Sequence, residues 1–258
     1  MEYAVAVVIR QIEKLGLSIS PQKTEVCAFS RAHRFVHEEV VVIKGYLIPV
    51  NADMKYLGLV LSRKWSFREH FNRLLPKAER MTLALARIMP NLRSPNEHAR
   101  KLYCGVIHSV IFYGAPVWAP TLRTDKRTTA AIQAVQRKVA LRVVAAYKTV
   151  SCPAAFLLAK VIPVDYLADR YKDVYMDTRA IQEKEIRITQ RMHDTIRERA
   201  LDAALTKWKN VYSRPTAVEV RRVLVHNLFQ WYKRARGHLT YRMTLMITSH
   251  GCFNDCTE

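Results

Sequence analysis

Hydrophobic and polar positions follow two different periods along the chain. Up to about residue 61 the apolar residues form short runs, with a helical run over 5–15 that stops at Gly16 and strand-like runs over 26–29, 40–43, 46–48 and 56–61. Beyond Trp65 the apolar residues recur at helical spacing, at Phe67, Phe71, Leu74, Leu75, Ala78, Met81, Leu85 and Ile88. The pattern predicts a mainly helical α+β protein, in which a small antiparallel sheet over residues 1–61 precedes a series of helices.

Further helices are predicted over 94–112, 125–147, 153–160 and 213–236. Residues 165–209 contain strong helix formers and neither Gly nor Pro, so they predict one long helix or two abutting helices. Between Leu102 and Leu122 there is no formally charged residue, a length that could cross a membrane. His108 and the breakers Gly114, Pro116 and Pro120 interrupt this stretch. We therefore interpret it as a buried helix and turn, and we predict no membrane contact.

The charge of the chain is strongly positive and unevenly distributed. Of the 258 residues, 42 are Lys or Arg and 22 are Asp or Glu, which gives a net charge of +20. Residues 1–60 carry seven basic and six acidic side chains, so almost all of the excess follows residue 60 and is spread over the predicted helices. An excess of this kind favours a polyanionic partner, and its spread favours nucleic acid over a membrane surface.

The cysteines and the N-terminus predict an intracellular protein, nuclear or cytoplasmic. The five cysteines are odd in number and form no C-x-x-C pair, which is typical of reduced thiols. Glu2 stands where a signal peptide has basic residues, and Arg10 ends the apolar run early. The sequence therefore predicts that the chain is not secreted.

Basic residues recur on single faces of the predicted helices. The helix over 67–89 carries one such stripe, formed by Arg73, Lys77, Arg80 and Arg87. The helix over 125–147 carries Arg137, Lys138 and Arg142. Stripes of this spacing suit contacts along a phosphate backbone, although an ordinary solvated face has the same pattern. Trp231 and Tyr232 lie among basic residues, where we expect core or interface positions in preference to base-stacking platforms.

The sequence evidence for a metal site is weaker than the evidence for a basic surface. A nucleotidyl-transfer site needs closely placed carboxylates for two metal ions, and the chain contains no Asp-Asp pair. Four aspartates recur every fourth residue, at Asp165, Asp169, Asp173 and Asp177, but basic neighbours such as Lys172 make a salt-bridged face the preferred interpretation. His250, Cys252 and Cys256 supply three ligands where a closed zinc site needs four. We predict no catalytic residue, no zinc site and no retained cofactor.

The order of several short motifs resembles the reverse transcriptase of non-LTR (LINE-type) retrotransposons, especially the insect site-specific and Jockey-like elements. The motifs that carry the resemblance span nearly the whole chain. They are Gly-Leu-Ser-Ile-Ser-Pro-Gln-Lys-Thr-Glu over 16–25, Lys-Tyr-Leu-Gly over 55–58, Trp-Ser-Phe-Arg-Glu-His over 65–70, Tyr-Gly-Ala-Pro-Val-Trp over 113–118, Ala-Leu-Arg-Val over 140–143, Ala-Tyr-Lys-Thr-Val-Ser over 146–151, Gly-His-Leu-Thr-Tyr over 237–241 and Thr-Ser-His-Gly-Cys-Phe over 248–253.

The resemblance implies the part of the polymerase that begins just after the catalytic Asp-Asp motif. Residues 1–61 would be the end of the palm with a primer-grip-like hairpin, residues 62–150 a helical thumb, and residues 151–258 a basic connector leading to a truncated zinc-binding segment. Lys23 would then lie in a loop that closes on the incoming nucleotide, and Lys55 and Tyr56 would position the primer strand.

The resemblance also implies the partners. The chain would be a fragment of an RNA-directed DNA polymerase that binds an RNA and DNA template-primer duplex, while the full-length relative supplies the other polymerase and endonuclease portions and uses Mg²⁺. We expect this chain alone to be inactive in primer extension. The alternative is a non-enzymatic relic, domesticated or a pseudogene product, that binds nucleic acid or protein.

Overall fold

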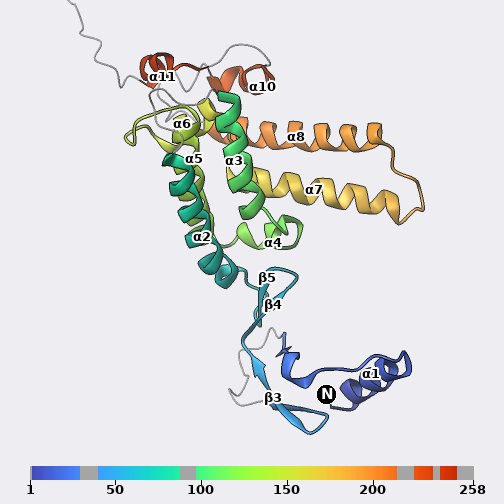
Figure 1. The fold of residues 1–258 in the computed structure, drawn as a ribbon. Coiled ribbons are helices and arrows are strands. Elements are labelled where there is room, and N and C mark those ends of the chain that lie inside the picture. Colours follow the sequence, from blue (N-terminus) through green and yellow to red (C-terminus); the bar gives the residue numbers. More distant parts are fainter. Residues whose placement is uncertain (1, 30–39, 88–96, 214–223, 235–238, 249–258) are drawn as a thin grey trace, which may run out of the picture. The chain divides into compact units, whose positions relative to one another are not determined.

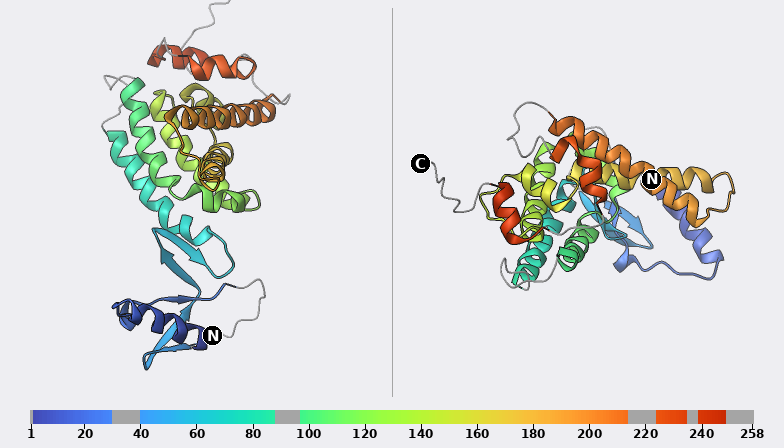
Figure 2. Two further views of the ribbon diagram at one scale, coloured as in Figure 1. Left: turned by 90° about the vertical axis from the view of Figure 1, so that its right-hand side faces the viewer. Right: turned by 90° about the horizontal axis from the view of Figure 1, so that it is seen from above.

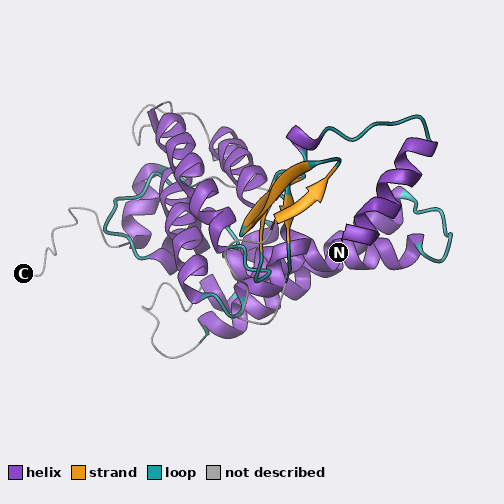
Figure 3. Cartoon of the chain, turned by 90° about the horizontal axis from the view of Figure 1, so that it is seen from below, coloured by secondary structure: helices purple, strands orange, loops and turns teal. Residues whose placement is uncertain are grey.

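The computed structural model describes residues 2–29, 40–87, 97–213, 224–234 and 239–248, and it divides into two compact units, Met1–Asn72 and Arg73–Glu258 (Figure 1). All described strands belong to the first unit, and helices make up nearly all of the regular structure of the second (Figure 3). The mainly helical α+β class is therefore confirmed. The sequence placed domain boundaries at 61/62 and 150/151, whereas the compact units meet within one helix, α2 (Arg68–Arg87).

A three-stranded sheet organises the first unit. After α1 (Glu2–Lys14) and a short 3₁₀ turn (Pro21–Lys23), the strands β1 (Val26–Cys27), β2 (Val40–Ile43) and β3 (Tyr46–Asn51) form a sheet in the order β1-β3-β2. β2 and β3 are antiparallel, but β1 pairs in parallel with β3, so the prediction of a wholly antiparallel sheet is corrected. Its core combines Val41, Ile43 and Ile48 with apolar residues of α1.

A separate hairpin follows the sheet. β4 (Asp53–Tyr56) and β5 (Leu59–Ser62) pair antiparallel, with Tyr56 opposite Leu59. The prediction of one strand over 56–61 is wrong, because Leu57 and Gly58 both have positive φ, 45° and 84°, and reverse the chain in a two-residue turn. Nδ1 of the buried His70 accepts a hydrogen bond of 3.4 Å from the backbone N–H of Val60, which joins the hairpin to the start of α2.

In the second unit, α3 (Glu97–Ile111) is followed directly by α4 (Ala115–Leu122). The sequence predicted that Gly114, Pro116 and Pro120 break the helical pattern. Gly114 does break it, with φ 67°, but Pro116 lies in the first turn of α4, where a proline is tolerated because its missing N–H would have had no helical partner. Both prolines therefore belong to a new helix, in which Trp118 is fully buried.

Taken singly, no helix within the described segments is long and apolar enough to cross a membrane. α3 and α4 reach that length and composition only as a pair, and they bend by 81° at their junction.

α5 (Lys126–Val143) and α6 (Cys152–Ala159) form the centre of the second unit. Asp125 caps α5 by accepting a hydrogen bond from the N–H of Thr128, as expected for a helix that begins after an aspartate. α5 ends before the predicted residue 147 because Ala145 adopts a left-handed conformation with φ 52°. α6 is wholly apolar, and Phe156, Leu157 and Leu158 are buried.

α7 (Val164–Gln182) and α8 (Gln190–Tyr212) form an antiparallel helical hairpin (Figure 1 and Figure 2). Asp169 pairs with Lys207 and Asp177 with Arg199, a register that only antiparallel helices allow. Of the two alternatives for residues 165–209, two helices are therefore present, separated by a turn. Two further helices, α10 (Leu228–Lys233) and α11 (Tyr241–Thr248), lie at one end of this unit. Much of the helix predicted over 213–236 lies outside the described residues.

A small polar cluster lies inside the second unit between α3 and α5. The side-chain amide nitrogen of Gln136 donates to the carbonyl oxygen of Ile162 at 3.2 Å and lies 3.4 Å from Nε2 of His108, and the ring of His108 is 3.8 Å from Sγ of Cys104. Burial lowers the pKa of His108 to about 4 and raises the pKa of Cys104 to about 12. Both groups are therefore neutral at physiological pH.

The buried His108 should make the stability of this unit depend on pH. The pKa of His108 in the folded state lies below its ordinary value. Between these two pKa values His108 is therefore protonated in the unfolded chain and neutral in the folded chain. The free energy of unfolding should therefore fall by about 3 kcal/mol as the pH drops from about 6.5 to about 4. Urea titrations across this range should give a pH dependence that is smaller by about this amount in His108→Gln than in the native chain. His226→Gln, at an exposed histidine, should retain the full pH dependence.

Candidate nucleic-acid interface

The basic stripe of α2 is exposed as the sequence predicted. The side chains of Arg73, Lys77, Arg80 and Arg87 are all exposed, and their spacing of four, three and seven residues places them on one strip of the helix. Within the described parts of the chain, no ion pair occupies Lys77, Arg80 or Arg87. These cations are therefore available to an external anion.

A groove of about 760 Å³ lies beside this stripe. α2 and α5 both contribute to its walls and floor, and the loop after α5 forms one end; the lining residues are Thr82, Leu83, Ala86, Arg137, Lys138, Leu141, Arg142, Ala146, Tyr147, Lys148 and Thr149. Leu83 is three residues after Arg80 and four before Arg87, so on the helix surface it is the direct neighbour of both. The stripe therefore borders the groove.

Two of the predicted binding residues make bonds within the protein. Nη2 of Arg137 donates to the carbonyl oxygens of Lys148 and Val150, at 2.5 and 2.7 Å, and so fixes the loop at the end of the groove. Lys138 forms an ion pair with Glu79 of α2, which ties the two walls together. The structure thus gives Arg137 and Lys138 positions in the groove and a part in shaping it.

Arg142 and Lys148 are the other cations of the groove. Arg142 follows Lys138 by one helical turn and was visible in the sequence as part of the α5 stripe. Lys148 was missed as a candidate, because only the turn after α5 brings it back over the helix. Arg100, which is almost fully buried, donates to the carbonyl oxygen of Arg142 at 2.8 Å and adds positive charge nearby. Among the residues that the structure describes, no acidic side chain lines the groove.

The three predicted residues of the first unit are exposed but are not gathered into one site. Lys23 ends the 3₁₀ turn before β1, and Lys55 and Tyr56 lie in β4, after the end of β3. Because β1 and β3 run parallel, with Cys27 opposite Asn51, the register places Lys23 and Lys55 toward opposite ends of β3. Lys55 and Tyr56 are consecutive in a strand and so point to opposite faces. Their assigned roles stay predictions.

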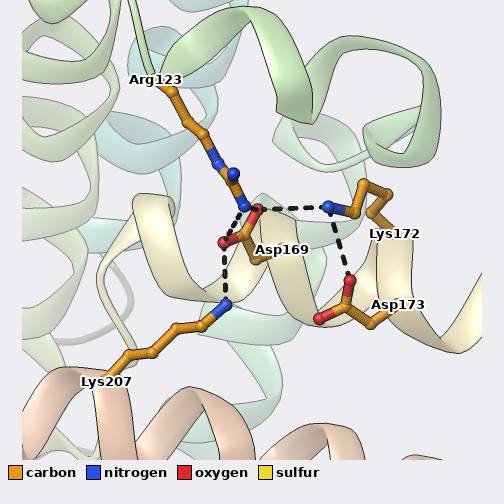
Figure 4. A network of polar contacts seen from close by, with 5 residues as sticks. All are labelled: Arg123, Asp169, Lys172, Asp173 and Lys207. Carbon is orange, nitrogen blue, oxygen red and sulfur yellow. Dashed lines mark hydrogen bonds and ion pairs between the residues drawn. The ribbon is translucent and has the colours of Figure 1, made fainter.

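Three of the four aspartates of α7, Asp169, Asp173 and Asp177, form ion pairs, which confirms a salt-bridged face as the preferred interpretation for them. The nearly buried carboxylate of Asp169 accepts hydrogen bonds from Arg123 at 3.0 and 3.1 Å and from Lys207 at 3.1 Å, with Lys172 at 3.8 Å (Figure 4). Lys172 also pairs with Asp173. Burial raises the pKa of Asp165, which accepts a hydrogen bond from Gln133. In the described ranges, no three His, Cys, Asp or Glu side chains come together as metal ligands.

The aromatic pair near the C-terminus has a packing role. The indole N–H of Trp231 donates to the carbonyl oxygen of Leu157 at 2.7 Å, and the guanidinium of Arg234 lies 4.1 Å from the ring centroid. Tyr232 is largely removed from solvent, and this desolvation raises its pKa. Both residues therefore join α10 to the helices beneath it. The candidate zinc ligands His250, Cys252 and Cys256 lie outside the described residues.

Comparisons with known proteins give one informative match. No family model and no solved structure matches the chain. Over 251 residues it is 24% identical to a 115 kDa protein in the type-1 retrotransposable element R1DM of Drosophila melanogaster. The match covers 93% of this chain, which spans 24% of the length of that relative. Similarity along almost the whole chain supports an origin in a retrotransposable element.

Proposed function

We propose that this chain is the nucleic-acid-binding part of a non-LTR retrotransposon reverse transcriptase, located downstream of the catalytic aspartates. In this proposal the first unit is the end of the palm, and the helices of the second unit are the thumb and connector. The order of the sequence motifs and the similarity to a retrotransposable-element protein support this assignment. Its partner would be the RNA–DNA hybrid that forms during reverse transcription.

The observation that carries the proposal is the stripe of α2 beside the groove. A phosphate backbone needs exposed cations at regular intervals, and the stripe supplies four along one helix. Phosphate contacts of this kind position a duplex without reading its sequence, as template-primer binding requires. The adjoining groove adds Arg142 of α5 and Lys148 of the loop that follows this helix.

The stripe can be tested by removing three of its charges. The stripe variant carries Lys77→Gln, Arg80→Gln and Arg87→Gln, at exposed positions where the fold should be unaffected. Each lost phosphate contact should weaken binding about tenfold at about 0.1 M salt, so the affinity for an RNA–DNA hybrid should fall about 100- to 1,000-fold. Fluorescence anisotropy with a labelled blunt hybrid measures this loss.

A matched variant on the α7–α8 turn controls for net charge. Lys184→Gln, Arg187→Gln and Arg191→Gln remove three exposed charges at a site away from the stripe, and screening should limit their effect to about threefold. Equal losses in the two variants would show that bulk charge, and not the stripe, holds the hybrid. A chain that binds no hybrid at all would favour the alternative of a non-enzymatic protein-binding relic.

A further inference from the structure

The floor of the groove between α2 and α5 is apolar although its surroundings are basic. Leu83 and Ala86 on α2 and Leu141 and Ala146 on the α5 side contribute hydrocarbon surface, and Leu83 is 59% exposed. A surface that contacted only phosphates would gain nothing from this floor. The volume of about 760 Å³ lies in the range of pockets that enclose small organic molecules, about 300–1,000 Å³.

An aromatic ring is held in place at the end of this floor. Tyr147 is 43% exposed, and its hydroxyl oxygen accepts a hydrogen bond of 2.9 Å from the hydroxyl of Tyr241 in α11. The two rings meet edge to face, with centroids 6.3 Å apart. α11 is in turn fixed by Thr244, whose hydroxyl donates to the carbonyl oxygen of Val144 at 2.8 Å. The ring of Tyr147 is therefore positioned before any ligand arrives.

We propose that this groove binds an unpaired nucleotide at the end of a nucleic-acid strand. Its base lies on the apolar floor against Tyr147, and its phosphate faces Arg142 and Lys148. Bases within a duplex are stacked on one another, so only an unpaired base can present its face to this floor. The inference rests on the proposed function, because the neighbouring stripe would hold the duplex from which the unpaired nucleotide extends.

The experiment compares two RNA–DNA hybrids with equal numbers of phosphates. One is blunt, and the other has an unpaired end labelled with the fluorescent base 2-aminopurine. The native chain should bind the hybrid with the unpaired end about 5- to 150-fold more tightly, the range that stacking of one base on an aromatic ring supplies. Binding should also quench the 2-aminopurine fluorescence, because the base stacks on Tyr147.

Variants at the groove separate stacking from charge and from folding. Tyr147→Ala should reduce the preference for the unpaired end to within about twofold and leave the affinity for the blunt hybrid unchanged. Tyr147→Phe retains the ring and should retain most of the preference. Leu83→Glu places an acid on the floor at an exposed position and should abolish the preference without affecting folding. The stripe variant should weaken both hybrids equally.

The two proposals fail in different ways. If the native chain binds both hybrids with equal affinity, the groove proposal is overturned while the proposed function stands. If it binds neither hybrid, both proposals are overturned. If a polyglutamate peptide displaces the unpaired end but a single-stranded oligonucleotide does not, the groove belongs to an acidic protein segment, and the groove proposal is likewise rejected.

Discussion

The affinity of this chain for an RNA–DNA hybrid with an unpaired end should fall by about 10³- to 10⁵-fold when the salt concentration rises from 50 to 200 mM. This range corresponds to about 6–10 phosphate contacts, each of which releases bound counterions. The stripe and the groove supply six candidate cations, namely Arg73, Lys77, Arg80, Arg87, Arg142 and Lys148. A loss at the lower end of the range would match these six.

The slope of the salt dependence locates the contacts. Plotted as the logarithm of affinity against the logarithm of salt concentration, the native chain should give a slope of about −5. The stripe variant should flatten this slope by about three, since each lost phosphate contact removes about one. The control variant on the α7–α8 turn should leave it unchanged. A native slope shallower than about −2 would show that the stripe and groove do not bind the backbone.

The helices could be predicted where their apolar period was regular, and their ends could not. The stripe of α2 was predictable because residues on one helix keep a fixed angular relation whatever packs against them. The turn between α7 and α8 was hidden, because no Gly or Pro marks it. In this turn Glu185 adopts a left-handed conformation and Thr189 caps α8. Neither feature can be predicted from the neighbouring residues alone.

The groove was not predictable from the sequence, because it depends on contacts between distant residues. Tyr147 and Tyr241 are 94 residues apart, and nothing in either segment points to the other. Arg137 was proposed as a phosphate ligand on helical spacing alone, and that spacing could not show that its guanidinium meets the carbonyl groups of Lys148 and Val150. The sequence identified the basic surface, and the fold determines which cations on it face solvent.

Trp118→Ala should lower the free energy of unfolding of the second unit by about 3–5 kcal/mol, the usual cost of truncating a buried aromatic side chain. Trp118 has no exposed surface, and its indole N–H donates to the carbonyl oxygen of Tyr113 at 2.9 Å. This hydrogen bond spans Gly114 and the bend between α3 and α4, so the indole also fixes the geometry of that bend. The loss is a large share of a typical domain stability of about 5–15 kcal/mol.

Urea unfolding followed by far-UV circular dichroism measures this loss, and two variants define its cause. Trp118→Phe keeps most of the apolar volume but leaves the Tyr113 carbonyl without the indole donor, so its cost should be smaller. Leu102→Ala shortens an exposed side chain on the neighbouring α3 and should cost less than about 0.5 kcal/mol. Where Trp118→Ala is still folded, its affinity for the RNA–DNA hybrid should equal that of the native chain, because the indole faces the core. A selective loss of affinity without a loss of stability would contradict the packing role of Trp118 and would place this residue in the binding surface.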